Sequence, residues 1–87
     1  MIIKFHKNFE KRFSKLPNKI REQFKKRRDL FLANSYDPTL NNHSPHGPLD
    51  GYRSINVTGD LRAIYKQIAK DSVEFVDIGT HHELFGN

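Results

Sequence analysis

The last third of the chain consists of short β-rich segments separated by turns, and this pattern constrains the fold more than any other feature of the sequence. Three such segments follow one another, at residues 52–57, 61–68 and 73–79. In the first, Ile55 and Val57 alternate with Ser54 and Asn56, as expected of a strand with one buried face. Connections as short as these join adjacent antiparallel strands. We therefore expect a three-stranded antiparallel meander.

The first third of the chain has the spacing of amphipathic helices. Two apolar stripes recur there, one made of Phe9, Phe13 and Leu16 and the other of Ile20, Phe24 and Phe31. Pro17 lies between them and suits the first turn of a second helix. Residues 1–6 are β-rich, and residues 34–51 have the composition of a long loop. The expected fold class is α+β, with an N-terminal strand and a helical hairpin packed on an antiparallel sheet.

The 87 residues are enough for a single domain, spanning 1–87, with a small core. The chain has no cysteine, which excludes a disulfide framework, a thiolate zinc site and a cysteine nucleophile. No apolar run approaches the roughly 20 residues of a membrane span, and the first residues do not resemble a secretory signal. We expect a cytoplasmic protein that does not bind membranes.

Basic residues are concentrated at the start of the chain. Residues 1–28 hold eleven of the fifteen Lys and Arg and only two acidic residues, a net charge of +9. The other 59 residues hold four basic and eight acidic residues, a net charge of −4. Such a segment indicates a polyanion or an acidic protein as partner. The alternative is a solvated helix face without a partner.

The five histidines are candidates for chemistry: His6, His43, His46, His81 and His82. Their spacing matches no helical zinc motif, and no carboxylate completes a ligand set, so we expect neither a metal nor another cofactor. Imidazole titrates near neutral pH and therefore suits general acid–base catalysis. We expect His6 and His82 to be surface residues without a role. His46 is equally compatible with a catalytic role and with a surface position without a role.

Arg62 follows Asp60 at the start of the second meander strand. A structural interpretation pairs the two side chains across the turn. A functional interpretation uses the guanidinium for bidentate contact with a phosphate on an open sheet face. The spacing alone does not distinguish them.

Two segments taken together resemble a known family. The run from Gly51 to Tyr65 contains Gly-Tyr-Arg and Gly-Asp-x-Arg-x-Ile-Tyr, and the run from Asp77 to Gly86 contains Gly-Thr-His and Leu-Phe-Gly. This combination resembles the RelE-like superfamily of bacterial toxins, and within it the YafQ-like branch. The order of strand, basic hairpin, loop, meander and tail is similar over nearly the whole chain, which implies the RelE/ParE-like microbial ribonuclease fold.

The resemblance implies the toxin of a type II toxin–antitoxin system. Such a toxin is a metal-independent endoribonuclease that cuts mRNA in the ribosomal A site and leaves a 2′,3′-cyclic phosphate and a 5′-hydroxyl. A cognate antitoxin neutralises it, and the toxin–antitoxin complex binds its own promoter DNA through the antitoxin. The basic helices would then dock on the ribosome or receive the antitoxin.

The resemblance also assigns roles to residues. His81 is expected to be the general acid, either Asp60 or His43 the general base, and Arg62 the residue that holds the phosphate oxygens. Phe85 is expected to stack on an unpaired base. The residues expected to contact the substrate are Phe85, Arg53, Ser54, Asn56 and His46.

Three positions depart from the YafQ-like pattern. Ser54 and Asn56 stand where that branch has an Asp and a His, and Pro45 replaces a leucine. Neither serine nor asparagine is a good acid or base, so the departures are compatible with a slow enzyme or with an altered codon preference. Other functions also stay open: a ParE-like toxin that inhibits DNA gyrase, a decayed nuclease, and an RNA-binding module that does not cut.

Overall fold

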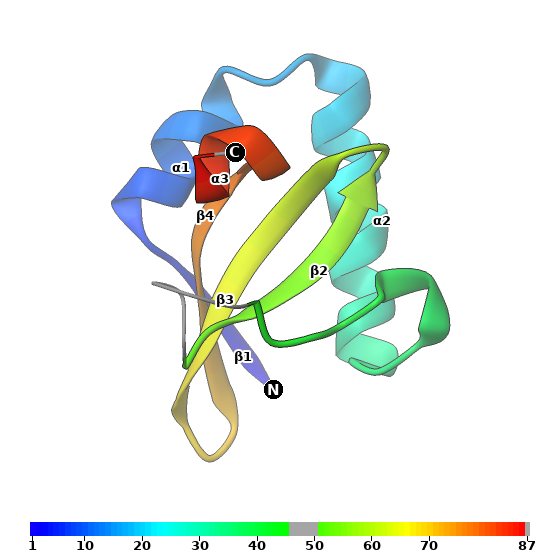
Figure 1. Ribbon diagram of the computed structural model, residues 1–87. Coiled ribbons are helices and arrows are strands. Elements are labelled where there is room, and N and C mark those ends of the chain that lie inside the picture. Colours follow the sequence, from blue (N-terminus) through cyan, green and yellow to red (C-terminus); the bar gives the residue numbers. More distant parts are fainter. Residues whose placement is uncertain (46–50, 87) are drawn as a thin grey trace.

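Four strands form one sheet in the order β1-β4-β3-β2 (Figure 1). The structure is a computed structural model that describes residues 1–45 and 51–86. The strands are β1 (Ile2–Phe5), β2 (Arg53–Thr58), β3 (Leu61–Ala69) and β4 (Ser72–Thr80). The helices are α1 (Lys7–Ser14), α2 (Asn18–Ala33), the 3₁₀ turn η1 (Pro38–Leu40) and α3 (His81–Phe85). The predicted α+β class is confirmed.

The sheet is mixed rather than purely antiparallel. Strands β2, β3 and β4 pair antiparallel in chain order, which confirms the predicted meander. β1 pairs with β4 in parallel, with Ile3 opposite Val73. The expected antiparallel sheet is therefore correct for the meander, while the opening strand adds a parallel edge. Parallel pairing is possible here because two helices and two strands separate β1 from β4 in the chain.

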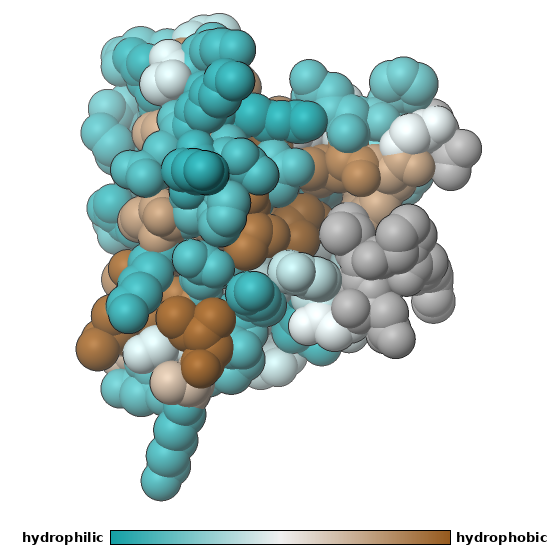
Figure 2. Space-filling view, turned by 90° about the vertical axis from the view of Figure 1, so that its left-hand side faces the viewer, coloured by the Kyte–Doolittle hydropathy of each residue, from teal (hydrophilic) through white to brown (hydrophobic). Residues whose placement is uncertain are grey.

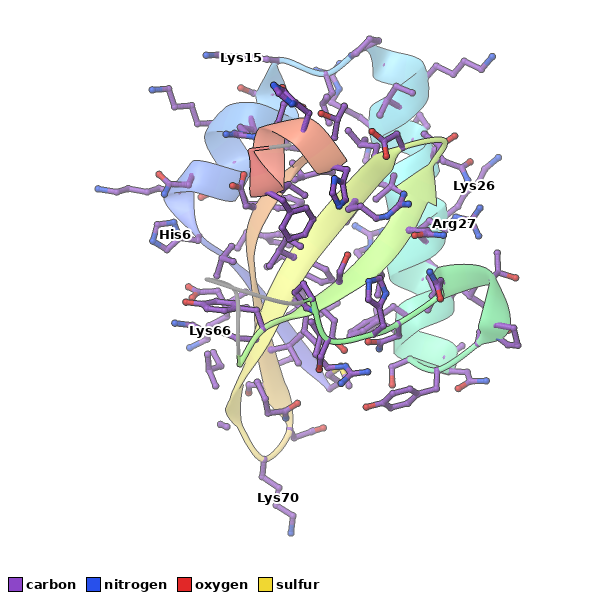
Figure 3. The ribbon with its side chains drawn as sticks, in the orientation of Figure 1. His6, Lys15, Lys26, Arg27, Lys66 and Lys70 are labelled. Atoms are coloured by element: carbon purple, nitrogen blue, oxygen red, sulfur yellow. The ribbon has the colours of Figure 1, made fainter. Side chains whose placement is uncertain are left out.

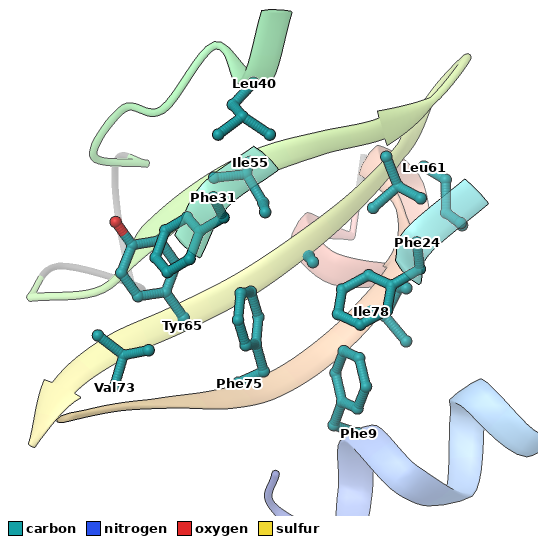
Figure 4. Packing of buried hydrophobic residues seen from close by; sticks show 12 residues of the cluster. Phe9, Phe24, Phe31, Leu40, Ile55, Leu61, Tyr65, Val73, Phe75 and Ile78 are labelled. Carbon is teal, nitrogen blue, oxygen red and sulfur yellow. The ribbon is translucent and has the colours of Figure 1, made fainter. Parts of the chain in front are cut away.

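The core lies between the sheet and the pair of helices α1 and α2. Phe75 of β4 is at its centre, with ring centroids 5.9 Å from Phe9, 5.6 Å from Phe24 and 5.6 Å from Phe31 (Figure 4). All four rings are at most 2% exposed. Fully burying a Phe side chain contributes roughly 1.5–3 kcal/mol. The two predicted helical stripes therefore meet the sheet through aromatic packing.

The backbone at each end of α2 explains where the helix begins and ends. The Pro17 carbonyl accepts hydrogen bonds from the amides of Ile20 and Arg21, so the proline precedes the helix without interrupting it. Asn34 follows the last helical residue in an extended conformation, and its amide donates to Leu30. No helix in residues 1–45 and 51–86 is long and apolar enough to cross a membrane.

The register of β2 and β3 determines which side chains face away from the core. Asn56 lies opposite Arg62 and Ser54 opposite Ile64, so all four share the face not covered by α1 and α2, called here the open face. Ile55 belongs to the hydrophobic cluster on the other face. Ser54, Asn56 and Arg62 therefore share one face of the sheet. The turn helix α3 follows β4 and lies at one end of this open face (Figure 1).

Candidate active site

A cavity of about 360 Å³ lies on the open face between α3 and the segment that precedes β2. Its described lining residues are Asn41, His43, Pro45, Ser54, Arg62, His81 and Phe85. Five of the nine predicted site residues therefore meet in one place. We call this the α3 cavity.

His43 is fixed at one side of the α3 cavity by backbone pairing. Its amide donates to the Ser54 carbonyl at 3.1 Å, and its carbonyl accepts from the Ser54 amide at 2.8 Å. The imidazole Nδ1 lies 2.7 Å from the carbonyl oxygen of Asn41, which adopts a left-handed conformation with φ of 46°. Because a carbonyl only accepts, Nδ1 carries the hydrogen, and a neutral ring then has its lone pair on Nε2.

His81 is fixed at the other side of the cavity by the start of α3. Thr80 caps this helix: its hydroxyl accepts from the Glu83 amide, and its own amide donates to the Glu83 carboxylate at 2.8 Å. That backbone hydrogen bond lowers the pKa of Glu83 below its usual range. The Asp60 carboxylate accepts from the His81 amide at 3.3 Å. His81 is therefore the first residue of a helix whose start is capped.

Phe85 lies one helical turn after His81 and lines the same cavity. The two ring centroids are 4.7 Å apart with planes inclined by 46°. Spacing of four residues places both rings on one face of α3. The phenyl ring thus supports the imidazole and leaves an aromatic surface at the cavity.

Arg62 supplies the only Lys or Arg side chain among the described lining residues of the cavity. One guanidinium nitrogen donates to the Gly59 carbonyl at 3.1 Å, which ties the side chain to its own turn. In the described part of the chain no ion pair joins Arg62 to Asp60. The structural interpretation of that pair is therefore wrong, and Arg62 keeps donors available for an anion.

Two polar side chains on the open face lack partners within the described residues. Ser54 is 1% exposed and lines the cavity, yet its Oγ has no hydrogen bond. The Oδ1 of Asn56 is buried and likewise unpaired. An unsatisfied buried polar atom costs roughly 1–3 kcal/mol. Such atoms are common where a ligand completes the hydrogen bonding.

Comparison with known proteins decides the family. The family description "bacterial toxin of type II toxin–antitoxin system, YafQ" matches residues 1–86. The chain belongs to the YafQ family of toxins. No curated protein sequence matches it.

Solved structures agree with this membership. YafQ from E. coli strain BL21(DE3) is 27% identical, with a TM-score of 0.77 and 97% of each chain covered. The toxin in the E. coli DinJ-YafQ toxin–antitoxin complex is 28% identical, with a TM-score of 0.74 over 97% of this chain and 96% of that chain. A YoeB/ParE toxin from Agrobacterium tumefaciens shares the fold at 13% identity, with a TM-score of 0.76 over 93% and 99% of the two chains.

Among the remaining predicted residues of this YafQ-family toxin, Asp60, Asn56 and Arg53 do not line the cavity. Asp60 lies at its edge and contacts the His81 amide rather than lining the cavity. His46 lies outside the described residues. Asn56 faces the same side as Ser54 but does not line the cavity.

Arg53 faces the opposite side of the sheet, so the structure does not bring it to the cavity. It pairs with Tyr65 of β3, and its guanidinium donates to the Asn42 side chain at 2.7 Å and to the Ser44 hydroxyl at 3.1 Å. It also lies 5.5 Å above the Tyr36 ring. The guanidinium of Arg53 therefore holds the loop before β2.

Sequence reasoning missed Asn41 and Pro45, which also line the cavity. The only available signal for Asn41 was its residue type, since asparagine is one of the few residues that tolerate the left-handed region. Among the described residues no group of three or more His, Asp or Glu could hold a metal ion.

Proposed function

We propose that this toxin is a metal-independent endoribonuclease that cleaves mRNA, with the α3 cavity as its active site. One observation carries the proposal: His43, Arg62 and His81 follow one another across the sheet. His43 pairs beside β2, Arg62 belongs to β3, and His81 follows β4, which is the spatial order of the strands. Cleavage by an internal ribose hydroxyl requires a base and an acid on opposite sides of a phosphate, with positive charge between them.

The chemistry follows from this order. His43 Nε2 takes the proton of the ribose 2′-hydroxyl, since Nδ1 is committed to the Asn41 carbonyl. The 2′-oxygen bonds to phosphorus while the bond to the 5′-oxygen breaks, and His81 gives that oxygen a proton. Arg62 stabilises the negative charge that develops on the non-bridging oxygens. The products are a 2′,3′-cyclic phosphate and a 5′-hydroxyl.

His43 suits the role of base better than Asp60 does. His43 lines the cavity, whereas the Asp60 carboxylate is exposed and accepts the His81 amide hydrogen. Asp60 is then a positioning residue that holds the start of α3. Ser54, buried beneath the cavity with an unpaired hydroxyl, hydrogen-bonds the bound nucleotide, and Phe85 stacks on a base.

The basic helices dock the toxin on the ribosome, where cleavage takes place in the A site. Six lysines of the basic N-terminal segment contact no carboxylate of a described residue: Lys4, Lys7, Lys11, Lys15, Lys19 and Lys26. Lys15 and Lys26 point away from the body of the molecule on opposite sides (Figure 3). Each phosphate neutralised by such a side chain makes binding more sensitive to salt.

An acidic cognate antitoxin neutralises the toxin by binding the same surface. The edge strand β1 exposes Ile2 and Phe5 (58% and 37%), which adds apolar area beside the basic helices. Hydrophobic surface is visible among hydrophilic side chains in Figure 2. Antitoxin and ribosome would then compete, and the complex would reach its promoter DNA through the antitoxin. The E. coli DinJ-YafQ complex supports an antitoxin partner.

The decisive experiment maps transcript ends after brief expression of the parent chain, His81→Ala and His82→Ala. We expect codon-phased cuts with 5′-hydroxyl ends. His81→Ala should lower the rate by about 10²–10⁴-fold, the usual contribution of a general acid. His82 is the matched control, because it is exposed and does not line the cavity.

Other outcomes contradict the proposal in different ways. Ends carrying a 5′-phosphate would refute the mechanism, as would cleavage of ribosome-free RNA that a chelator abolishes. Uncut transcripts with arrested DNA gyrase would indicate a ParE-like toxin. Uncut transcripts without gyrase arrest would leave an RNA-binding protein. If His81→Ala were as toxic as the parent, the general acid would have to be another residue, with His43 the next candidate.

A further inference from the structure

A second cavity of about 360 Å³ lies on the open face, and α3 contributes to both. His81 and Phe85 line the α3 cavity, whereas Leu84 lines the second. Strand β3 also contributes to both cavities, since Arg62 lines the α3 cavity and Lys66 lines the second. The two cavities are therefore neighbours along one strand.

Strand β3 sets the distance between the two cations. Arg62, Ile64 and Lys66 alternate with the core residues Leu61, Ala63 and Tyr65, so the first three share the open face. A strand rises about 3.3 Å per residue, so four residues separate the backbones of Arg62 and Lys66 by about 13 Å. No carboxylate of a described residue lies within ion-pair distance of Lys66. Both cations therefore remain available to one extended polyanion.

The second cavity has the parts that hold a nucleotide. Ile64, Val76 and Leu84 give it apolar surface. The half-buried Tyr52 supplies an aromatic ring, and the Lys66 ammonium lies 5.7 Å from the centre of that ring. Sites for single-stranded nucleic acid combine such a stacking ring with a cation for the backbone. Asp77 also lines the cavity; its Oδ1 accepts from the Ile78 amide and pairs with Arg12, which leaves Oδ2 to accept from an exocyclic amine of a base.

We infer that this cavity binds a nucleotide of the RNA strand next to the one cleaved in the α3 cavity. Tyr52 stacks on the base and Lys66 contacts a phosphate. The inference rests on the proposed function, because the identity of the nucleotide in the second cavity depends on the α3 cavity holding the scissile phosphate. It adds a subsite that would make the nucleotide neighbouring the cut contribute to affinity and sequence preference.

The test measures affinity for a short single-stranded RNA whose 2′-hydroxyl at the cleaved position is replaced by hydrogen, so that nothing is cut. Removing the base of one neighbouring nucleotide should weaken binding to the parent chain by about fivefold to 150-fold, the range found for one stacked base. In Tyr52→Leu the same abasic change should have much less effect. An equal loss in the parent and in Tyr52→Leu, at every neighbouring position, overturns the subsite.

A lysine pair provides a second measurement if Tyr52→Leu melts at a lower temperature than the parent. Lys66→Gln should weaken binding and reduce the dependence of affinity on salt by the equivalent of about one phosphate contact. Lys70→Gln is the matched control, because Lys70 lies in the β3–β4 turn, away from both cavities (Figure 3). Equal effects of the two substitutions would show unspecific attraction and overturn the inference.

The two proposals fail separately. If the toxin cuts transcripts but Tyr52→Leu does not change the effect of removing a neighbouring base, the subsite is refuted and the proposed function is not. If this coupling is found but transcripts remain uncut, the nucleotide-binding site is supported and the nuclease activity is refuted. Binding of an antitoxin peptide that depends on Tyr52, with no such dependence for RNA, would assign the cavity to the protein partner and overturn the subsite.

Discussion

The capping of α3 should control how well His81 is placed, and Thr80→Ala tests this directly. The helix has only five residues, too few to be stable alone, so its start depends on Thr80, Glu83 and Asp60. Replacing a threonine N-cap by alanine costs about 1 kcal/mol, within a range of roughly 0.5–2. One kcal/mol is about a fivefold change in the equilibrium between closed and open α3.

The effect can be measured without the reaction. The Gly86 amide donates to the His82 carbonyl at 2.8 Å, so its hydrogen exchange reports opening of α3. We expect about fivefold faster exchange at Gly86 in Thr80→Ala, unchanged exchange in the sheet, and slower RNA cleavage. Thr39→Ala is the control, because Thr39 is exposed and its hydroxyl makes no hydrogen bond to a described residue. Unchanged exchange at Gly86 in Thr80→Ala would refute the argument.

The Glu83 carboxylate makes the stability of α3 depend on pH, and the direction of this dependence can be stated. The Thr80 amide lowers the pKa of Glu83 in the folded chain. The carboxylate therefore stabilises α3 fully above its ordinary value of 4.5, and this stabilisation is lost as the pH falls through the lower, folded value. Glu83→Gln should thus show faster exchange than the parent at neutral pH and approach the parent in acid. A difference in exchange rate between Glu83→Gln and the parent that grows as the pH falls would contradict this expectation.

Three further substitutions test the framework around the site. Gly79→Ala should loosen α3, because a Cβ there would lie 2.8 Å from an Arg12 guanidinium nitrogen and 3.3 Å from the Glu83 Cβ; exchange at the α3 amides measures it. Phe24→Ala should lower the free energy of unfolding by about 3–5 kcal/mol in a urea titration, since the ring is 2% exposed. Arg53→Lys should lower the melting temperature without abolishing RNA binding, because a lysine cannot make the guanidinium's three hydrogen bonds to Asn42 and Ser44.

Local patterns were sufficient to predict the meander and both main helices. Turn length determined the pairing of β2, β3 and β4, and the spacing of apolar residues determined which helix faces are buried. The parallel pairing of β1 had no such signal, because its partner strand lies about 70 residues away in the chain. Contacts of that separation depend on the complete fold rather than on neighbouring residues.

The candidate site was predictable where it lies on regular structure and less so in the loop. Alternation along β2 placed Ser54 and Asn56 on the open face, and the same rule places Arg53 with Ile55 on the other. That rule alone would have removed Arg53 from the set of substrate contacts. The position of His43 could not be predicted, because it depends on backbone hydrogen bonds to Ser54 made by a loop without a periodic pattern.

The turn between β2 and β3 connects Arg62 to His81, the residues proposed to hold the phosphate and to act as the acid. A bulge between Asn56 and Thr58 lets Asn56 face Arg62, and a slip of one residue would move Arg62 to the core side. Gly59 has a φ of 52° in this turn, a conformation that disfavours other residues by roughly 1–2 kcal/mol. Its carbonyl accepts from Arg62, and the next residue, Asp60, accepts from the His81 amide. The turn therefore holds Arg62 of β3 and His81 of α3 in their relative positions, which is what the proposed mechanism requires of them.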